Sequence, residues 1–194
     1  EELREELTQL FAAGDSTVIY ATTEPGEALL LGGYTAVLDA GELLQYGPTA
    51  EVFHAPKSLR VARAFSDPPM NLIEARPETL GVRLYAGPAV PIPVSAMASG
   101  LTPRLTVGVR AAALRLAARE GDVALAGTVE LAEISGSDTF IHLSTAMGGV
   151  VAQIAGVHYF KLGAPVTLHF SPEQVYVFDA AGELLVAPRA QGRN

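Results

Sequence analysis

The chain has 194 residues, of which 49% are hydrophobic and 18% charged, and this balance suits a folded chain with a core of its own rather than disorder. Its net charge of -8, from 21 acidic and 13 basic residues, leaves no basic cluster to hold a polyphosphate backbone, so nucleic acid is not expected as a partner. The absence of cysteine excludes disulfides, thiolate metal sites and cysteine nucleophiles. No apolar run approaches the ~20 residues that a membrane-spanning helix needs.

The first third alternates between helical and strand patterns. Apolar residues at helical spacing predict a helix over residues 3–11. Residues 17–21 (TVIYA) form a continuous apolar run rich in β-branched side chains, which predicts a strand buried on both faces, as in a parallel sheet. A short helix is expected over residues 25–31, with Glu24 as its cap and Glu27 in its first turn.

A hairpin and two further helices are expected next. Residues 34–38 and 43–46 read as strands, and residues 39–42 (DAGE) as the turn between them. One helix should open at residue 49, and a second should cover residues 58–65.

The pattern changes at residues 67–69 (DPP), beyond which the helical period is nearly gone. Many short runs of strand type with Gly and Pro between them indicate a β-sandwich or a small barrel. We therefore predict two domains, residues 1–65 and residues 66–194. The strand-type runs cover residues 72–75, 82–85, 105–110, 127–134, 139–143, 150–154, 166–170 and 174–178.

The residues alone define no catalytic constellation. There is no G-x-x-x-x-G-K-[ST] phosphate loop, and neither of the two lysines, Lys57 and Lys161, follows a glycine. Ser135, Ser137 and Asp138 around a glycine are typical of a polar turn between strands, and Glu130 with Glu133 does not by itself define an acid/base pair. Surface or structural roles are expected for the four scattered histidines, His54, His142, His158 and His169.

Four segments up to residue 72 resemble ABC transporter ATPases. Residues 17–28 (TVIYATTEPGEA) resemble their switch-loop region, in which a buried strand ends in Thr-His-Asp and Glu-Ala follows. Residues 39–47 (DAGELLQYG) are similar to the D-G-x-[IL]-x-Q-x-G hairpin, and residues 48–56 (PTAEVFHAP) to the T-P-x-E-[IV]-[FY]-x-x-P helix. Residues 66–72 (SDPPMNL) resemble the G-x-P-x-M-N-x-[LF] junction of sugar- and polyol-type importer ATPases.

The second part resembles the accessory β domain of the same family, called TOBE, which has an OB-like fold. Residues 107–110 (VGVR) stand where the family has G-[IV]-R-P-E. Residues 127–129 (GTV), residues 133–137 (EISGS) and residues 178–182 (FDAAG) also look like this domain. The resemblance follows the family order through essentially the whole chain.

The resemblance implies an α+β chain: residues 1–65 as the C-terminal remnant of an α/β ABC nucleotide-binding domain, and residues 66–194 as a mostly antiparallel β, OB-like (TOBE) accessory domain. The implied function is the C-terminal part of the ATP-coupling subunit of a solute importer, with the β domain serving dimerisation and regulation. The full-length parent would use ATP and Mg, whereas no cofactor is expected for this chain, which is predicted to be inactive alone. The implied partners are transmembrane permease subunits and a second ATPase subunit in a homo-oligomer at the cytoplasmic face of the membrane.

One departure from the family concerns the nucleotide site. The switch histidine, which contacts the γ-phosphate and helps to position the attacking water, falls on Thr23. A threonine donates one hydrogen bond but lacks the charge and the reach of an imidazole. Pro25 replaces the usual Gln, and Ala111 and Ala112 replace the Pro-Glu pair. The resemblance thus implies either a degenerate ATP site at Thr23 or a plain residue before a helix.

Two rival functions remain open at the level of sequence. One is a free-standing OB-like module that binds a small ligand or a regulatory protein, because the mouths of small barrels hold such ligands. It predicts a pocket within residues 66–194 and no role for residues 1–65. The other is an enzyme of unknown type.

Overall fold

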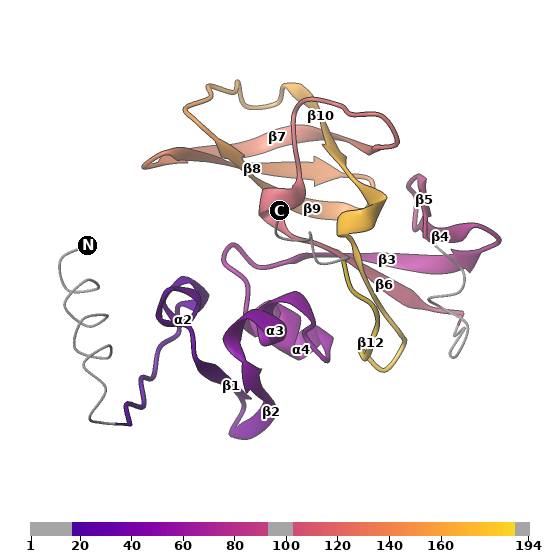
Figure 1. Ribbon diagram of the computed structural model, residues 1–194. Coiled ribbons are helices and arrows are strands. Elements are labelled where there is room, and N and C mark those ends of the chain that lie inside the picture. The colour runs from indigo at the N-terminus through magenta and orange to yellow at the C-terminus, as the bar shows by residue number, and fades with distance from the viewer. Residues whose placement is uncertain (1–16, 93–102, 189–194) are drawn as a thin grey trace.

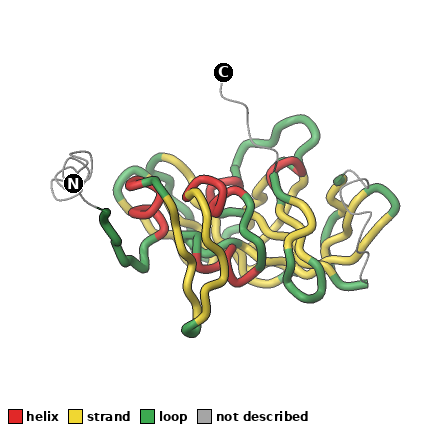
Figure 2. The backbone as a smooth tube through the Cα atoms, turned by 60° about the horizontal axis from the view of Figure 1, so that its bottom comes forward, coloured by secondary structure: helices red, strands yellow, loops and turns green. Residues whose placement is uncertain are grey.

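The computed structural model describes residues 17–92 and 103–188. Antiparallel strands predominate among the regular elements and the helices are short (Figure 2), which confirms the α+β prediction with a mostly antiparallel β part. The helix expected over residues 3–11 lies outside the described residues. No helix in the described ranges is long and apolar enough to cross a membrane.

The first described part is a hairpin with three helices around it, as the sequence predicts. The helix α2 (Pro25–Leu31) begins with its proline at the first position, although the side chain of Glu24 makes no capping hydrogen bond. Strands β1 (Tyr34–Asp39) and β2 (Glu42–Pro48) pair through a two-residue turn in which Ala40 and Gly41 have φ angles of 49° and 78°. Both positive values suit the twist of a tight hairpin. Helices α3 (Thr49–His54) and α4 (Leu59–Ala64) follow.

A small apolar cluster holds the hairpin to its helices. Val37 on the inner face of β1 packs with Val52 of α3, Val61 of α4 and Phe65. The side chain of Ser58 accepts a hydrogen bond from the N–H of Val61 and so caps α4. The hairpin therefore has one buried face, and in Figure 1 its turn points away from the larger sheets.

The strand predicted over residues 17–21 is wrong for this chain. Residues 17–22 have no regular secondary structure, and Ile19 is 94% exposed. A strand that is apolar on both faces needs partner strands at its edges and packed layers above and below. The described residues place neither beside this run, so its apolar side chains face solvent.

The remaining strands form two antiparallel sheets. The order in the six-stranded sheet is β12-β11-β6-β3-β4-β5, and in the four-stranded sheet β10-β7-β8-β9. All eight predicted strand-type runs contain a strand, the last of them from Tyr176 onward, whereas the short strands β5 and β12 were not predicted. The bounds are β3 (Asn71–Glu78), β4 (Gly81–Leu84), β5 (Ala89–Pro91), β6 (Leu105–Val109), β7 (Val123–Ser135), β8 (Asp138–Thr145), β9 (Gly148–Ala155), β10 (Pro165–Phe170), β11 (Tyr176–Phe178) and β12 (Leu184–Val186).

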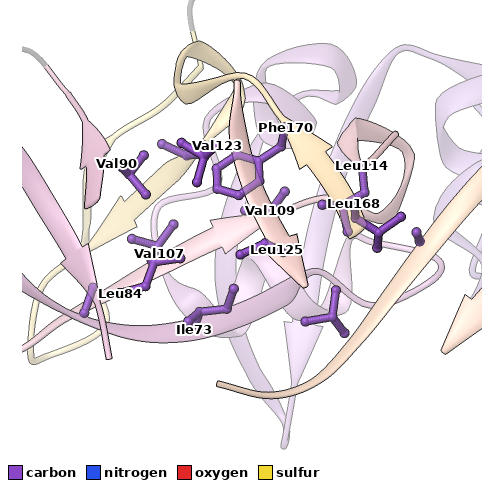
Figure 3. Close-up of a cluster of buried hydrophobic side chains, with 14 of the residues drawn as sticks. Ile73, Leu84, Val90, Val107, Val109, Leu114, Val123, Leu125, Leu168 and Phe170 are labelled. Atoms are coloured by element: carbon purple, nitrogen blue, oxygen red, sulfur yellow. The ribbon is translucent and has the colours of Figure 1, made fainter. Parts of the chain in front are cut away.

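The two sheets share one hydrophobic core. Ile73 and Val107 of the six-stranded sheet belong to the same buried cluster as Leu125 and Phe170 of the four-stranded sheet. Figure 3 shows these side chains pointing toward one another, with Leu114 closing one side from the loop after the 3-10 helix η2 (Ala111–Ala113). The apolar residues of both sheets therefore form one core, and we call residues 71–92 and 103–186 the β body.

A buried asparagine joins the two sheets. Asn71, at the start of β3, donates from Nδ2 to the carbonyl oxygens of Val109 and Val151, at 3.1 and 2.8 Å. Its Oδ1 accepts from the N–H of Val151 at 2.7 Å. The amide side chain thus pairs with the free edge of β9 as a short piece of strand would.

Replacing Asn71 with alanine is expected to destabilise the chain by about 2–4 kcal/mol, because the half-buried N–H and C=O groups of Val151 and the carbonyl of Val109 lose a partner. Urea unfolding followed by circular dichroism measures the change. Gln153→Ala, on the same strand β9, is the matched control. An equal loss in the two variants would contradict the role given to Asn71.

An ion pair closes the loop between η2 and β7. A terminal nitrogen of Arg115 lies 2.6 Å from both carboxylate oxygens of Asp122, and the N–H of Arg119 donates to the same carboxylate at 2.8 Å. Burial of this carboxylate, whose side chain is 4% exposed, raises its pKa. The Arg119 N–H and the Arg115 guanidinium outweigh that effect, so the pKa of Asp122 lies below its usual value of 3.8.

The Asp122→Asn variant should have a lower melting temperature than the wild type at pH 7, and the difference should shrink on acidification. A carboxyl group with a lowered pKa in the folded state stabilises above its unfolded pKa, near 4, and loses this effect as the pH falls through the folded value. Thermal scans between pH 7 and pH 2.5 test this, with Glu120→Gln in the same loop as control. A difference that stays constant over this range would refute the assignment.

Candidate functional site

Thr23, which the resemblance places at the switch position, lies in a loop before α2. Thr23 is exposed and follows the irregular segment 17–22, and Pro25 then starts the helix. The loop is shaped by its neighbours. The Thr22 hydroxyl donates to a carboxylate oxygen of Glu27 at 2.5 Å, and the hydroxyl of Tyr20 donates to the same oxygen at 3.1 Å. Thr23 thus lies at the apex of a loop whose shape is fixed by the hydrogen bonds of Tyr20 and Thr22 to Glu27.

The turn at this apex is stabilised from within. The N–H of Glu24 donates to Oγ1 of Thr22 at 2.9 Å, which is the short-range pattern of a threonine turn. The sequence showed Glu27 only as a favourable acid in the first turn of α2. Its role as acceptor for residues five and seven positions earlier was missed, because the resemblance marks Glu27 without saying which groups it binds.

The described residues do not fit an ATP and Mg²⁺ site by themselves. Phosphate groups are held by N–H groups and cations directed at the same point, and Mg²⁺ by oxygen ligands. Next to Thr23 the chain carries the carboxylate of Glu24, and Glu27 follows in the first turn of α2. In the ranges that the structure describes, no three His, Asp or Glu side chains could hold a metal ion together. Thr23 is therefore at most one member of a site that other residues must complete.

The other polar residues that the sequence singled out have structural surroundings. Gly136 and Ser137 form the turn between β7 and β8, with a φ of 61° at Gly136, and this confirms the turn interpretation. The histidines fall in separate places: His54 ends α3, His142 lies in β8 with its Nε2 3.5 Å from a Glu133 carboxylate oxygen, His158 follows β9 and His169 lies in β10.

The outer face of the β1–β2 hairpin is apolar and open. Leu38 and Leu43 lie directly opposite each other and are 67% and 60% exposed. Tyr34 and Tyr46 on the same face are stacked with ring centroids 5.6 Å apart, and both are also largely exposed. We call Tyr34, Leu38, Leu43 and Tyr46 the hairpin face. Isolated two-stranded hairpins are marginal in water, and a contiguous apolar patch marks a contact surface.

The β body carries a family domain. Residues 107–178, from β6 to β11, match the model of the TOBE domain. The chain therefore contains a TOBE domain, as the sequence resemblance predicted.

Relatives among curated proteins extend the match to most of the chain. The sn-glycerol-3-phosphate import ATP-binding protein UgpC of Chromobacterium violaceum is 31% identical over 180 residues, which are 92% of this chain and 48% of that protein. The alpha-glucoside transport ATP-binding protein AglK of Rhizobium meliloti is 30% identical over 175 residues, 87% of this chain and 48% of that protein. The maltose/maltodextrin import ATP-binding protein MalK of Photobacterium profundum is 29% identical over 177 residues, 84% of this chain and 48% of that protein.

The chain is a homologue of ATP-binding subunits of ABC importers, and it spans about half the length of the curated relatives it matches. A solved structure, the cytoplasmic molybdate-binding protein ModG, is similar with a TM-score of 0.45 and 14% identity, covering 55% of this chain and 94% of that one.

Proposed function

We propose that the chain acts as the C-terminal part of the ATP-coupling subunit of an ABC importer for a small solute such as a sugar or a polyol. Residues 1–65 complete the nucleotide-binding domain, and residues 66–194 form the accessory β domain, which serves dimerisation and regulation. ATP and Mg²⁺ bind to the full-length protein. Permease subunits and a second ATPase subunit are its partners, at the cytoplasmic face of the membrane. The names of the three relatives support a small polar solute.

The hairpin face is the observation that carries this proposal. Four large apolar side chains, each 60–68% exposed, lie open on one face of a small hairpin. Nearby in sequence, Val18, Ile19 and Tyr20 are also exposed, although their pattern is that of a buried strand. These two surfaces are what remains when a sheet has lost its neighbouring strands and covering helices. They support a role for residues 17–65 as the last part of a larger domain.

Thr23 occupies the switch position of this domain. One hydroxyl there lacks the imidazole's charge, which helps to stabilise the γ-phosphate and orient water in the family. The full-length protein is then a weak ATPase, or it works beside a second subunit with a competent site. In the first case the two ATPase subunits of the transporter form a homodimer, and in the second case they form a heterodimer.

The coding sequence upstream of Glu1 tests the proposal most directly. It should encode a G-x-x-x-x-G-K-[ST] phosphate loop and a segment similar to L-S-G-G-Q, in that order. Calorimetry on both forms adds a biochemical measurement: the full-length protein should bind ATP, whereas the chain as given should show no micromolar-range binding. An upstream sequence without either motif would reject the proposal and favour the free-standing binding module.

A further inference from the structure

A single arginine joins the helices of the first part to the β body. Arg110 follows strand β6, and its terminal nitrogens donate to the carbonyl oxygen of Phe53 at 2.6 Å, to the carbonyl oxygen of Phe65 at 3.2 Å and to Oγ of Ser66 at 2.8 Å. Its Nε donates to the hydroxyl of Tyr176 in β11 at 3.2 Å. All three guanidinium nitrogens thus bind groups that are 44 to 66 residues away in sequence.

Two aromatic rings also contact the guanidinium group of Arg110. Its central carbon lies 3.7 Å from the ring centroid of Phe53 and 5.4 Å from that of Tyr176. Phe53 belongs to α3 and Tyr176 to β11. Cation–π contacts strengthen when the cation is partly removed from water, as it is here. The planar, five-donor group of arginine meets this set of acceptors, and a lysine ammonium does not.

Contacts around Arg110 tie α4 to the same sheet. The N–H of Leu59 donates to the carbonyl oxygen of Gly182 at 2.8 Å, and the N–H of Leu184 donates to the carbonyl oxygen of Lys57 at 3.0 Å. Ala62 of α4 is fully buried in a cluster with residues of β11. Segment 57–64 is therefore bonded to β12 and packed on β11. The change in sequence composition near residue 66 does not coincide with a loose joint in the structure.

We infer that Arg110 is a positioning residue that locks α3 and α4 onto the β body, so that residues 49–66 and the TOBE domain move as one rigid unit. This inference deepens the proposed function and rests on it. A movement of the nucleotide-binding part would be transmitted directly to the β domain. In the opposite direction, a ligand or protein bound to the β domain would act on the nucleotide-binding part through the same contacts.

Hydrogen exchange on the 194-residue chain tests whether Arg110 holds α3 and α4 on the β body. In Arg110→Met, which keeps the bulk and removes the donors, the amides of Ala55, Ala62 and Phe65 should exchange about 10- to 100-fold faster, since hydrogen bonds to a charged group are lost. Amides that pair β7 with β8 should keep their rates. Arg83→Met removes an exposed arginine whose ion-pair partner is Glu78, and it should change neither set.

Distance measurements give a second readout, because the wild-type chain has no cysteine and spin labels can be placed freely. Labels on Glu51→Cys in α3 and Ser144→Cys in β8 should give a narrow distance distribution that broadens in Arg110→Met. Arg110→Lys should broaden it too, and it replaces Arg110→Met should the methionine variant not fold. Unchanged widths and exchange rates would overturn the inference, and so would faster exchange of equal size throughout the chain, which would mark Arg110 as a general stabiliser.

The full-length protein separates this inference from the proposed function. With ATP added, the labelled distance should stay constant in the wild type and change in the Arg110 variants. A wild-type distance that shifts with ATP would refute the rigid unit. A full-length protein that binds no ATP would instead refute the proposed function, while the lock in the isolated chain would still be decided by the exchange rates.

Discussion

Replacing Thr23 with histidine in the full-length protein should raise ATP hydrolysis by about 10²–10³-fold, because a preorganised group of this kind is typically worth that factor in rate. The structure places Thr23 on an exposed loop whose neighbours, Thr22 and Glu27, hold each other. An imidazole at this position would extend into solvent-accessible space without breaking a contact. Steady-state phosphate release by the protein assembled with its permease partners measures the effect.

Two controls make this result specific. Thr23→Ser keeps a hydroxyl and should leave the rate low, and Thr22→His puts the same imidazole one residue away, where the hydroxyl that binds Glu27 is lost. If the wild type already hydrolyses ATP at rates ordinary for importers and Thr23→His adds nothing, Thr23 is simply the residue that precedes a helix.

Segment 17–21 shows where sequence reasoning about this chain reaches its limit. Its composition is that of a buried strand, and the family resemblance assigned the same structure, yet the residues are irregular and exposed here. An apolar pattern shows that a segment is suited to burial between neighbouring strands and layers. It forms a strand only where those neighbours are present. The hairpin beside it formed as predicted, because Ala40 and Gly41 provide a local turn that needs no distant partner.

Most strands of the β body could be predicted individually from the sequence, but their order and pairing in the two sheets could not. Long runs such as residues 127–134 extend over enough positions to be found, whereas the short strands β5 and β12 were not predicted. The order of the strands in the two sheets depends on pairings such as β3 with β6, which no local pattern encodes.

The two polar residues that join separate parts could be located from sequence but not interpreted. The motif resemblance marked Asn71 and Arg110, because both lie in segments similar to family motifs. Their hydrogen-bond partners could not be predicted from the sequence. Asn71 binds Val151, and Arg110 binds Phe53 and Tyr176, over separations of 57 to 80 residues. A buried amide or guanidinium needs acceptors in the right directions, and only the folded chain shows where these lie.

The second large effect is expected at the hairpin face. The chain as given should self-associate through this face, and Leu38→Lys combined with Leu43→Glu should weaken association by at least about 100-fold, because two leucines each lose about 1.5–3 kcal/mol of burial. The two residues lie opposite each other, so the new charges can pair across the hairpin and its fold is kept. Light scattering and sedimentation over a dilution series measure the association constant.

The matched control is Leu80→Lys combined with Tyr85→Glu. These side chains are 77% and 72% exposed on the β body, and the double change also leaves the net charge at -8, since one positive and one negative charge are added. Association through the hairpin face requires that this control still associates as the wild type does. A wild type that stays monomeric at high concentration, or a control that dissociates equally, would show that the open apolar residues of β1 and β2 are not the surface by which this chain finds its neighbours.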